Sequence, residues 1–354
     1  MRMRSLAAVG LAGLSLMAAG CGSDDDDSTS TPAASTPAAS TSTAAEPAGK
    51  EIKVGLVTDI GGLNDRSFNS LANKGLEDAK SKLGATGRVL TSKSNADYVP
   101  NLSTLAQQKY DLVVGVGFLM ADAMGVVAKK FPDTNFAIID VDQASLKGKP
   151  ANVEGLLFKE QEGGYLSGYL AALYAKDNKI TTISSVGGQK IPPVDHYIAG
   201  YQAGAKAAFP TIKTLNGYSQ DFVDQSKCKE IALDQIGQGS GVVFQVAGQC
   251  GLGALDAAKE KSKLGVGVDA DQGYLGAHIL TSATKKVDVA VYNTIEAVQK
   301  GTFKPGVNTV FDLKTDGVGI GKLSAAGTKY QAQIDKVAAD IKAGTVTVPD
   351  TIGK

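Results

Sequence analysis

From residue 52 onward, the chain alternates short runs of β-branched residues with longer stretches whose apolar positions recur at helical spacing. The first unit combines a predicted strand over residues 52–58, a glycine-containing turn, and apolar residues at positions 68, 71, 72, 76 and 79. Apolar residues three or four positions apart form one face of a helix. Strands that alternate with such helices predict parallel sheets covered by helices.

The same unit returns several times along the chain. Further predicted strands cover residues 112–116, 136–141, 180–186, 242–246 and 264–268, and further predicted helices cover 120–130, 194–208 and 252–261. No sequence repeat is obvious, but the succession is long enough for two doubly wound sheets of about five or six strands each. We therefore predict an α/β fold of two Rossmann-like lobes.

Carboxylates and glycines recur directly after these predicted strands. They include Asp59, Gly61, Gly117, Asp140, Gly188, Gly248 and Asp269. In open parallel sheets, ligands bind beyond the carboxyl ends of the strands. Glycine lets a ligand approach the backbone, and carboxylates accept hydrogen bonds from hydroxyl groups, so both residue types suit a binding site.

The first 50 residues differ from the rest and are excluded from the fold prediction. Arg2 and Arg4 precede an apolar run over residues 6–19, which is too short for a permanent membrane span. The small residues before Cys21 resemble the lipobox of bacterial lipoproteins, in which the cysteine thiol receives a diacylglycerol. An ordinary cleaved signal with an incidental Cys21 is the alternative. We predict a signal peptide over 1–20 and a disordered Ser/Thr/Ala/Pro linker over 21–50.

Composition narrows the classes of partner. Hydrophobic residues make up 43% of the chain, and the 36 Lys and Arg residues balance the 36 Asp and Glu residues. This balance gives no basic footprint for nucleic acid. With only two histidines and no clustered cysteines, no zinc-type ligand set can be assembled, and no metal and no cofactor are expected. Export would permit a disulfide between Cys228 and Cys250, and a pair of buried free thiols is equally open.

The segment richest in candidate binding residues is 57–69, with the sequence VTDIGGLNDRSFN. It resembles the basic membrane protein family of ABC-transporter solute-binding lipoproteins, whose best-understood members are purine nucleoside receptors. Further matches follow in the same order at residues 158–166, 187–192, 199–204, 268–272 and 281–292. The resemblance covers residues 51 to about 325.

The resemblance implies the type I periplasmic-binding-protein fold, in which two α/β lobes joined by a hinge close over a ligand. We assign residues 51–160 and 283–303 to the N-terminal lobe, and residues 161–282 and 304–354 to the C-terminal lobe. In such relatives two aromatic rings enclose the purine base, while acidic and lysine side chains hold the ribose hydroxyls. The implied ligand-binding residues are Asp59, Asp65, Ser67, Phe68, Asn69, Gly117, Phe222, Gly248, Asp269 and Lys285.

Each role has a structural alternative. By periodicity alone, Phe68 belongs to the hydrophobic face of its helix. Asp59 and Asp65 could be turn and N-cap residues. Phe222 could be a packing anchor in its loop, and Lys285, which precedes Lys286, could be solvated.

The expected function is that of a binding protein and not of an enzyme. Neither His196 nor His278 lies near a nucleophile motif, and residues 248–253 lack the Gly-Lys-Ser/Thr ending of a phosphate-binding loop. The expected partners are a purine nucleoside, an ABC permease and, through the lipid anchor, the outer face of the cell membrane; the chain is expected to be a monomer. A sugar or signalling ligand, a nucleoside hydrolase, and a surface lipoprotein with a vestigial pocket are the rival hypotheses.

Overall fold

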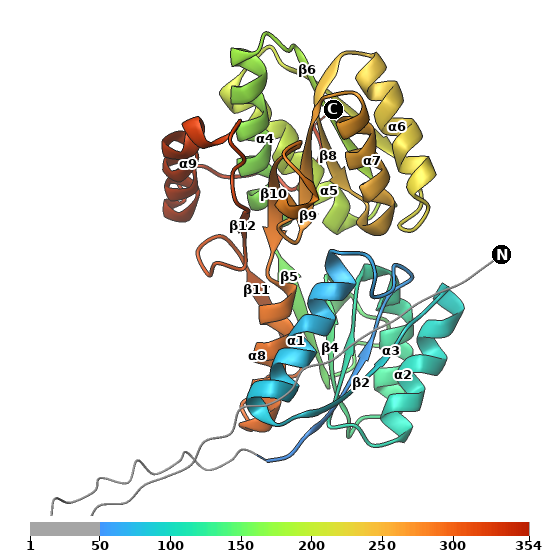
Figure 1. The fold of residues 1–354 in the computed structure, drawn as a ribbon. Helices are drawn as coiled ribbons and strands as arrows, with labels where there is room; N and C mark the ends of the chain where they lie inside the picture. Colours follow the sequence, from blue (N-terminus) through green and yellow to red (C-terminus); the bar gives the residue numbers. More distant parts are fainter. Residues whose placement is uncertain (1–49, 354) are drawn as a thin grey trace, which may run out of the picture. The chain divides into compact units, whose positions relative to one another are not determined.

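The computed structural model describes residues 50–353 and confirms the α/β fold. Figure 1 shows two sheets, each with helices on both sides. The strands of the first sheet lie in the order β11 (Asn308–Phe311), β5 (Val153–Phe158), β4 (Asn135–Ile139), β3 (Leu112–Gly115), β1 (Lys53–Val57) and β2 (Thr86–Leu90). Those of the second lie in the order β12 (Val318–Ile320), β10 (Ile279–Lys285), β9 (Leu264–Asp269), β8 (Ser240–Val246), β6 (Thr182–Gly187) and β7 (Lys213–Tyr218). Within the described chain, only the β10–β12 pair is antiparallel.

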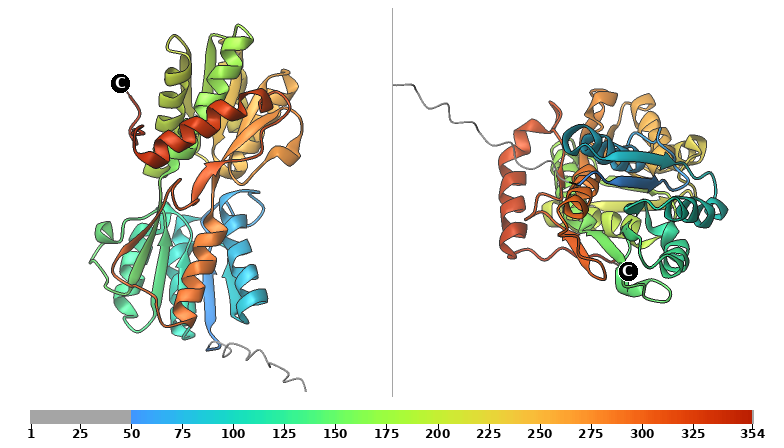
Figure 2. Two further views of the ribbon diagram at one scale, coloured as in Figure 1. Left: turned by 90° about the vertical axis from the view of Figure 1, so that its left-hand side faces the viewer. Right: turned by 90° about the horizontal axis from the view of Figure 1, so that it is seen from below.

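Each sheet separates two hydrophobic cores. In the first lobe, α1 (Phe68–Leu83) and α8 (Val287–Gln299) cover one face, and α2 (Tyr98–Gln107) and α3 (Ala121–Lys130) cover the other. In the second lobe, α4 (Glu160–Asp177) and α5 (Pro192–Ala208) face α6 (Gln225–Gly237) and α7 (Gly248–Glu260) across the sheet. The last helix, α9 (Gln331–Ala343), lies beside α4 (Figure 2).

The course of the chain after α8 corrects one predicted boundary. Residues 304–354 were assigned to the C-terminal lobe, but β11 pairs in parallel with β5 at the edge of the first sheet. There Phe311 stacks on Phe158 with ring centroids 4.9 Å apart, and the Asn308 side chain accepts a hydrogen bond from the Gln143 N–H. The chain therefore crosses between the lobes three times, after β5, after β10 and after β11.

The two sheets share one topology. In each, the first strand of the lobe lies between the second and third, so strand order reverses at β1–β3 and again at β6–β8. Asp140 follows β4 and Asp269 ends β9, and both adopt positive φ, at 67° and 59°. Each begins an Asp-x-Asp-Gln sequence, over residues 140–143 and 269–272. The lobes thus contain a short repeat that inspection of the sequence alone did not reveal.

Cys228 and Cys250 form a disulfide with Cα atoms 5.6 Å apart, so the alternative of free thiols does not hold. The predicted signal peptide, Cys21 and the predicted linker up to residue 49 lie outside the described residues. Within residues 50–353, no helix is both long and apolar enough to cross a membrane.

Glycines allow α4 and α5 to pack at very short range. A Cβ atom at Gly164 or Gly168 would collide with a backbone carbonyl of α5, and one at Gly200 or Gly204 would collide with a carbonyl of α4. Only hydrogen atoms fit at these crossings, which holds residues 161–168 of α4 directly against residues 197–204 of α5. Glu160 and Tyr197, which belong to the site described below, lie on these two helices.

We expect Gly168→Ala to lower the free energy of unfolding by about 1–3 kcal/mol, because the added methyl group must push α4 away from the Tyr201 carbonyl. The measurement is a urea unfolding curve. Gly237→Ala is the matched control, since Gly237 is also helical and nothing lies within 4 Å of the added atom. An equal loss in both variants would contradict the packing argument.

Candidate functional site

A cavity lies where the carboxyl ends of the two sheets face each other. Nine of the ten predicted ligand-binding residues line it: Asp59, Asp65, Phe68, Asn69, Gly117, Phe222, Gly248, Asp269 and Lys285. The other lining residues are Gly61, Phe118, Leu119, Asp140, Ile191, Pro193, Val194, Tyr197, Val246 and Val268. Both lobes therefore contribute. Asp59 and Gly117 follow the strands of the first topological switch point, Gly248 follows β8 at the second, and Asp140 and Asp269 come from the ends of the neighbouring strands β4 and β9.

The loop after β1 is organised by Asp65. Its carboxylate accepts hydrogen bonds from the backbone N–H groups of Ser67, Asn69 and Ser70, at 3.0, 2.6 and 3.1 Å. These are unpaired donors at the start of α1, so Asp65 acts as a helix cap, as its structural alternative proposed. The buried Asp65 also borders the cavity.

Asn69 connects this cap to Asp59. Its side-chain amide donates to Asp59 Oδ1 at 2.7 Å, while its carbonyl oxygen accepts from the Asp59 N–H at 3.1 Å. The Gly61 N–H donates to the same carboxylate oxygen at 2.9 Å. Burial nevertheless raises the pKa of Asp59 to about 6, against the lowering effect of these hydrogen bonds. In the described chain, no donor reaches Asp59 Oδ2.

Gly117 explains why this second oxygen stays accessible. Gly117 has φ 104°, and a Cβ atom there would lie 3.0 Å from Asp59 Oδ2 and 3.3 Å from Phe68 Cε1. A side chain at this position would be strained and would crowd both groups. Glycine therefore keeps the acidic end of the cavity open.

The two predicted aromatic walls come from opposite lobes. Phe68 begins α1 and is half-buried, with both the cavity and the first core beside it. Phe222 lies in the loop between β7 and α6, and its ring packs directly on Gly188. Each ring therefore has the packing role that its structural alternative proposed, and each also lines the cavity.

Lys285, at the end of β10, is the buried cation of the site. Its side chain is 2% exposed and its Nζ lies 2.6 Å from Asp140 Oδ1 and 2.8 Å from Glu160 Oε1. The same amino group lies 5.0 Å from the centre of the Phe68 ring and 4.8 Å from that of Phe158. The alternative of a solvated lysine is wrong for Lys285, although its neighbour Lys286 is exposed.

Burial and pairing act in opposite directions on this group. Burial acts to lower the pKa of Lys285, but the two carboxylates outweigh it and raise the pKa above the ordinary value. Burial raises the pKa of Asp140 despite Lys285. For Glu160, burial is outweighed by Lys285 and by His196, whose Nδ1 lies 3.2 Å from Oε2, so its pKa is lowered.

Ser67 has a different position from the one predicted. It does not line the cavity; its hydroxyl donates to Asp269 Oδ2 at 2.6 Å, and the Val268 carbonyl lies 3.2 Å away. Ser67 belongs to the first lobe and Asp269 to the second, so this hydrogen bond connects the lobes directly. Tyr197 donates to the other oxygen of Asp269 at 3.2 Å. Burial raises the pKa of Asp269.

Sequence reasoning missed several lining residues. Asp140 was noted after a predicted strand but was given no role, although its Asp-x-Asp-Gln context matches that of Asp269. Tyr197 and the apolar residues of the 191–194 segment belong to a helix start that looked like ordinary core. Phe118 and Leu119 follow Gly117 directly, and their position after a strand was the available signal.

The cavity thus has two chemically different ends. Carboxylates and one lysine form the polar end, which can accept hydrogen bonds from ligand hydroxyls. Phe222, Ile191, Val194 and Val246 form an apolar wall from the second lobe. Among residues 50–353, no group of His, Cys, Asp and Glu has the arrangement of a metal site.

Comparisons with known proteins agree with this geometry. Residues 52–351 match the family described as ABC transporter substrate-binding protein PnrA-like. A lipoprotein of Pyrococcus horikoshii is 39% identical over 83% of this chain and 74% of its own. The ABC transporter nucleoside-binding protein BmpA of Lactococcus lactis is 33% identical over 98% of this chain and 99% of its own.

Solved structures give the same fold. An ABC transporter solute-binding protein from Aeropyrum pernix has a TM-score of 0.77 with 27% identity, covering 84% of this chain and 94% of that one. The arabinose-binding protein AraP from Geobacillus stearothermophilus has a TM-score of 0.59 at 12% identity, over 81% and 99% of the two chains. This second likeness concerns the fold alone.

We expect Lys285→Met to lower the free energy of unfolding by about 3–5 kcal/mol, because it leaves Asp140 and Glu160 buried without their cation. Chemical denaturation at pH 7 measures the loss. Lys286→Met is the control, since it removes the same charge from an exposed neighbour. Equal stability of the two variants would show that the buried pair does not stabilise the fold.

Proposed function

The chain belongs to the PnrA-like (Bmp) family of ABC transporter substrate-binding proteins, and we propose that its solute is a purine nucleoside. It is a binding protein and not an enzyme. In this proposal the two lobes capture the nucleoside outside the membrane and deliver it to an ABC permease. A lipid on Cys21 and the linker over 21–50 would keep the monomeric protein near that permease.

One observation carries the nucleoside proposal: aromatic rings from opposite lobes and a set of buried carboxylates line the same cavity. Phe68 and Phe222 are the rings, and Asp59, Asp140 and Asp269 are the carboxylates. A base stacked on an aromatic ring gains about 1–3 kcal/mol, and this gain does not depend on which base it is. The carboxylates suit the vicinal hydroxyls of ribose, because ionised carboxylates only accept hydrogen bonds. The nucleoside-binding relative BmpA supports the same ligand class.

Closure over the ligand follows from the positions of these groups. A ligand shifts a protein towards the closed state only as far as it binds that state better than the open one. A nucleoside that contacts Phe68 in the first lobe and Phe222 in the second meets this condition. The Ser67–Asp269 hydrogen bond between the lobes also stabilises the closed state, and it does so without the ligand.

Calorimetric titration with adenosine, guanosine, inosine and ribose tests the proposal. We expect the nucleosides to bind and ribose to bind far more weakly, since ribose lacks the stacking base. Phe68→Leu, which keeps an apolar side chain but removes the ring, should weaken nucleoside binding by about 1 kcal/mol or more. Phe131→Leu changes a ring outside the cavity and is the control. Heat with ribose but with no nucleoside would instead identify a sugar-binding protein.

The raised pKa of Asp59 predicts a pH dependence of binding. A ligand hydroxyl that donates to Asp59 favours the ionised carboxylate, so binding should weaken as pH falls through about 6. Between pH 7 and pH 5, the ionised fraction of a group with this pKa falls about tenfold, and Kd should rise by a similar factor. Asp59→Asn should bind more weakly at pH 7 and lose the part of this pH dependence that Asp59 supplies, while the part due to the raised pKa values of Asp140 and Asp269 remains. Tighter binding at pH 5 would mean that the protonated carboxyl donates to the ligand.

A further inference from the structure

The loop that carries Phe222, residues 219–224, is shaped mainly by hydrogen bonds within itself and the following turn. The Ser219 hydroxyl donates to the Asp221 carbonyl at 2.8 Å, and the Asp221 carboxylate accepts from the Val223 and Asp224 N–H groups at 2.8 and 3.1 Å. Lys227 pairs with the same carboxylate at 2.7 Å. These contacts define the local shape of the loop, but they do not fix its second half to the rest of the lobe.

The Phe222 ring lies at the edge of the second lobe. It packs on Gly188, which has no side chain beside the ring, and against the margin of the hydrophobic core. The loop joins β6 only at its start, where Ser219 and Gln220 donate to the carbonyls of Gly187 and Gly188 at 2.9 and 3.0 Å. Because the ring lies only at the margin of that core, its position also depends on the backbone at Phe222 itself.

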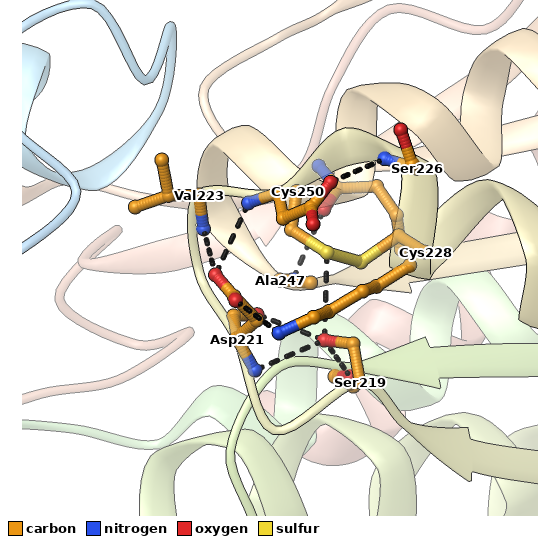
Figure 3. Close-up of a disulfide and its surroundings, with 11 residues drawn as sticks. Ser219, Asp221, Val223, Ser226, Cys228, Ala247 and Cys250 are labelled. Carbon is orange, nitrogen blue, oxygen red and sulfur yellow. Dashed lines mark hydrogen bonds and ion pairs between the residues drawn. A yellow bond between two sulfur atoms is a disulfide. The ribbon is translucent and has the colours of Figure 1, made fainter.

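That backbone is held by Cys250. The Cys250 N–H donates to the Phe222 carbonyl at 3.0 Å, and Cys250 lies two residues after Gly248, which lines the cavity. Its sulfur is bonded to Cys228 in the first turn of α6, the helix that follows the Phe222 loop (Figure 3). The disulfide therefore connects the start of α7 to the chain just beyond Phe222.

The core around this disulfide consists mainly of small side chains, with larger apolar residues of α6 packed at its margin. Its buried members are Val186, Cys228, Ala232, Val243, Ala247, Cys250, Ala254, Ala257 and Ala258. The starts of α6 and α7 also pack closely, since a Cβ atom at Gly253 would collide with the Gln225 carbonyl. The covalent bond adds a second constraint between the same two helix starts.

We infer that the Cys228–Cys250 disulfide is a positioning element of the ligand site, which fixes the loop of Phe222 so that its ring forms one wall of the cavity. The inference rests on the proposed function in taking that wall to contact the ligand. A preorganised wall increases affinity because binding does not have to order it. Neither cysteine is proposed to touch the ligand.

The test compares Cys228→Ala/Cys250→Ala with Phe222→Ala and with the triple variant. Complete loss of a stacked ring corresponds to about a 5- to 150-fold rise in Kd, and loss of the disulfide should cost a part of this. If the disulfide acts through Phe222, the effects will not add, and the triple variant will bind no more weakly than Phe222→Ala. Fully additive effects, or an unchanged Kd in the folded double variant, would overturn the inference.

A second measurement reports the loop directly and needs no ligand. The chain contains no tryptophan, so Phe222→Trp introduces a single tryptophan at the wall, whose fluorescence can be excited selectively over that of the tyrosines. We expect its fluorescence anisotropy to be lower in the variant that also lacks both cysteines, because the ring moves more freely. Equal anisotropy in the two proteins would overturn the positioning role.

A control separates positioning from a general loss of stability. Ile334→Ala removes a buried side chain of α9 in the same lobe and should destabilise the protein without changing Kd or, in the Phe222→Trp background, the fluorescence anisotropy. A matching rise in Kd in this control would overturn the inference. If no nucleoside binds the unaltered protein, the proposed function fails, while the anisotropy comparison still decides whether the disulfide fixes the loop.

Discussion

The buried ion group around Lys285 is the constraint on which the site and the hinge both depend. Lys285 ends β10 just before the chain returns to the first lobe, and Glu160 begins α4 just after the chain has left it. Asp140 adds a carboxylate from the first sheet. A buried charge is stable only when paired, so these three residues must keep their relative positions. Since Lys285 and Asp140 also line the cavity, the polar end of the site is built from the hinge itself.

The internal repeat shows how one framework supplies two different functions. Asp140 and Asp269 occupy equivalent strand ends with the same positive φ and the same following sequence. Asp140 pairs with Lys285, whereas Asp269 accepts hydrogen bonds from Ser67 and Tyr197. One member of the pair therefore stabilises the hinge, and the other connects the lobes across the cleft. The shared backbone geometry directs both carboxylates towards the cavity, and their neighbours decide what each one does.

The sequence was sufficient to predict those features that local pattern or resemblance encodes. Alternating strands and helices predicted both sheets, and the residues after the strands together with the family resemblance predicted nine of the nineteen lining residues. The short strand β11 was misplaced because three of its four residues are exposed, which leaves little hydrophobic pattern. The burial of Lys285 depends on partners 125 and 145 residues away along the chain, and the disulfide depends on a Cα separation that sequence does not give.

The contact between Ser67 and Asp269 bears on the energy of ligand capture. If closure depended on the ligand alone, part of the binding energy would be used to bring the lobes together, and affinity would fall by the fraction of closed protein. A hydrogen bond between the lobes raises that fraction before any ligand arrives. The same bond occupies Asp269 Oδ2. The atoms that can still accept a hydrogen bond from a ligand are Asp59 Oδ2 and, through their remaining lone pairs, the carboxylate oxygens of Asp140 and Asp269. A ligand with two neighbouring hydroxyls and a flat apolar ring matches this arrangement, because its hydroxyls can reach several carboxylates while the ring meets Phe68 and Phe222.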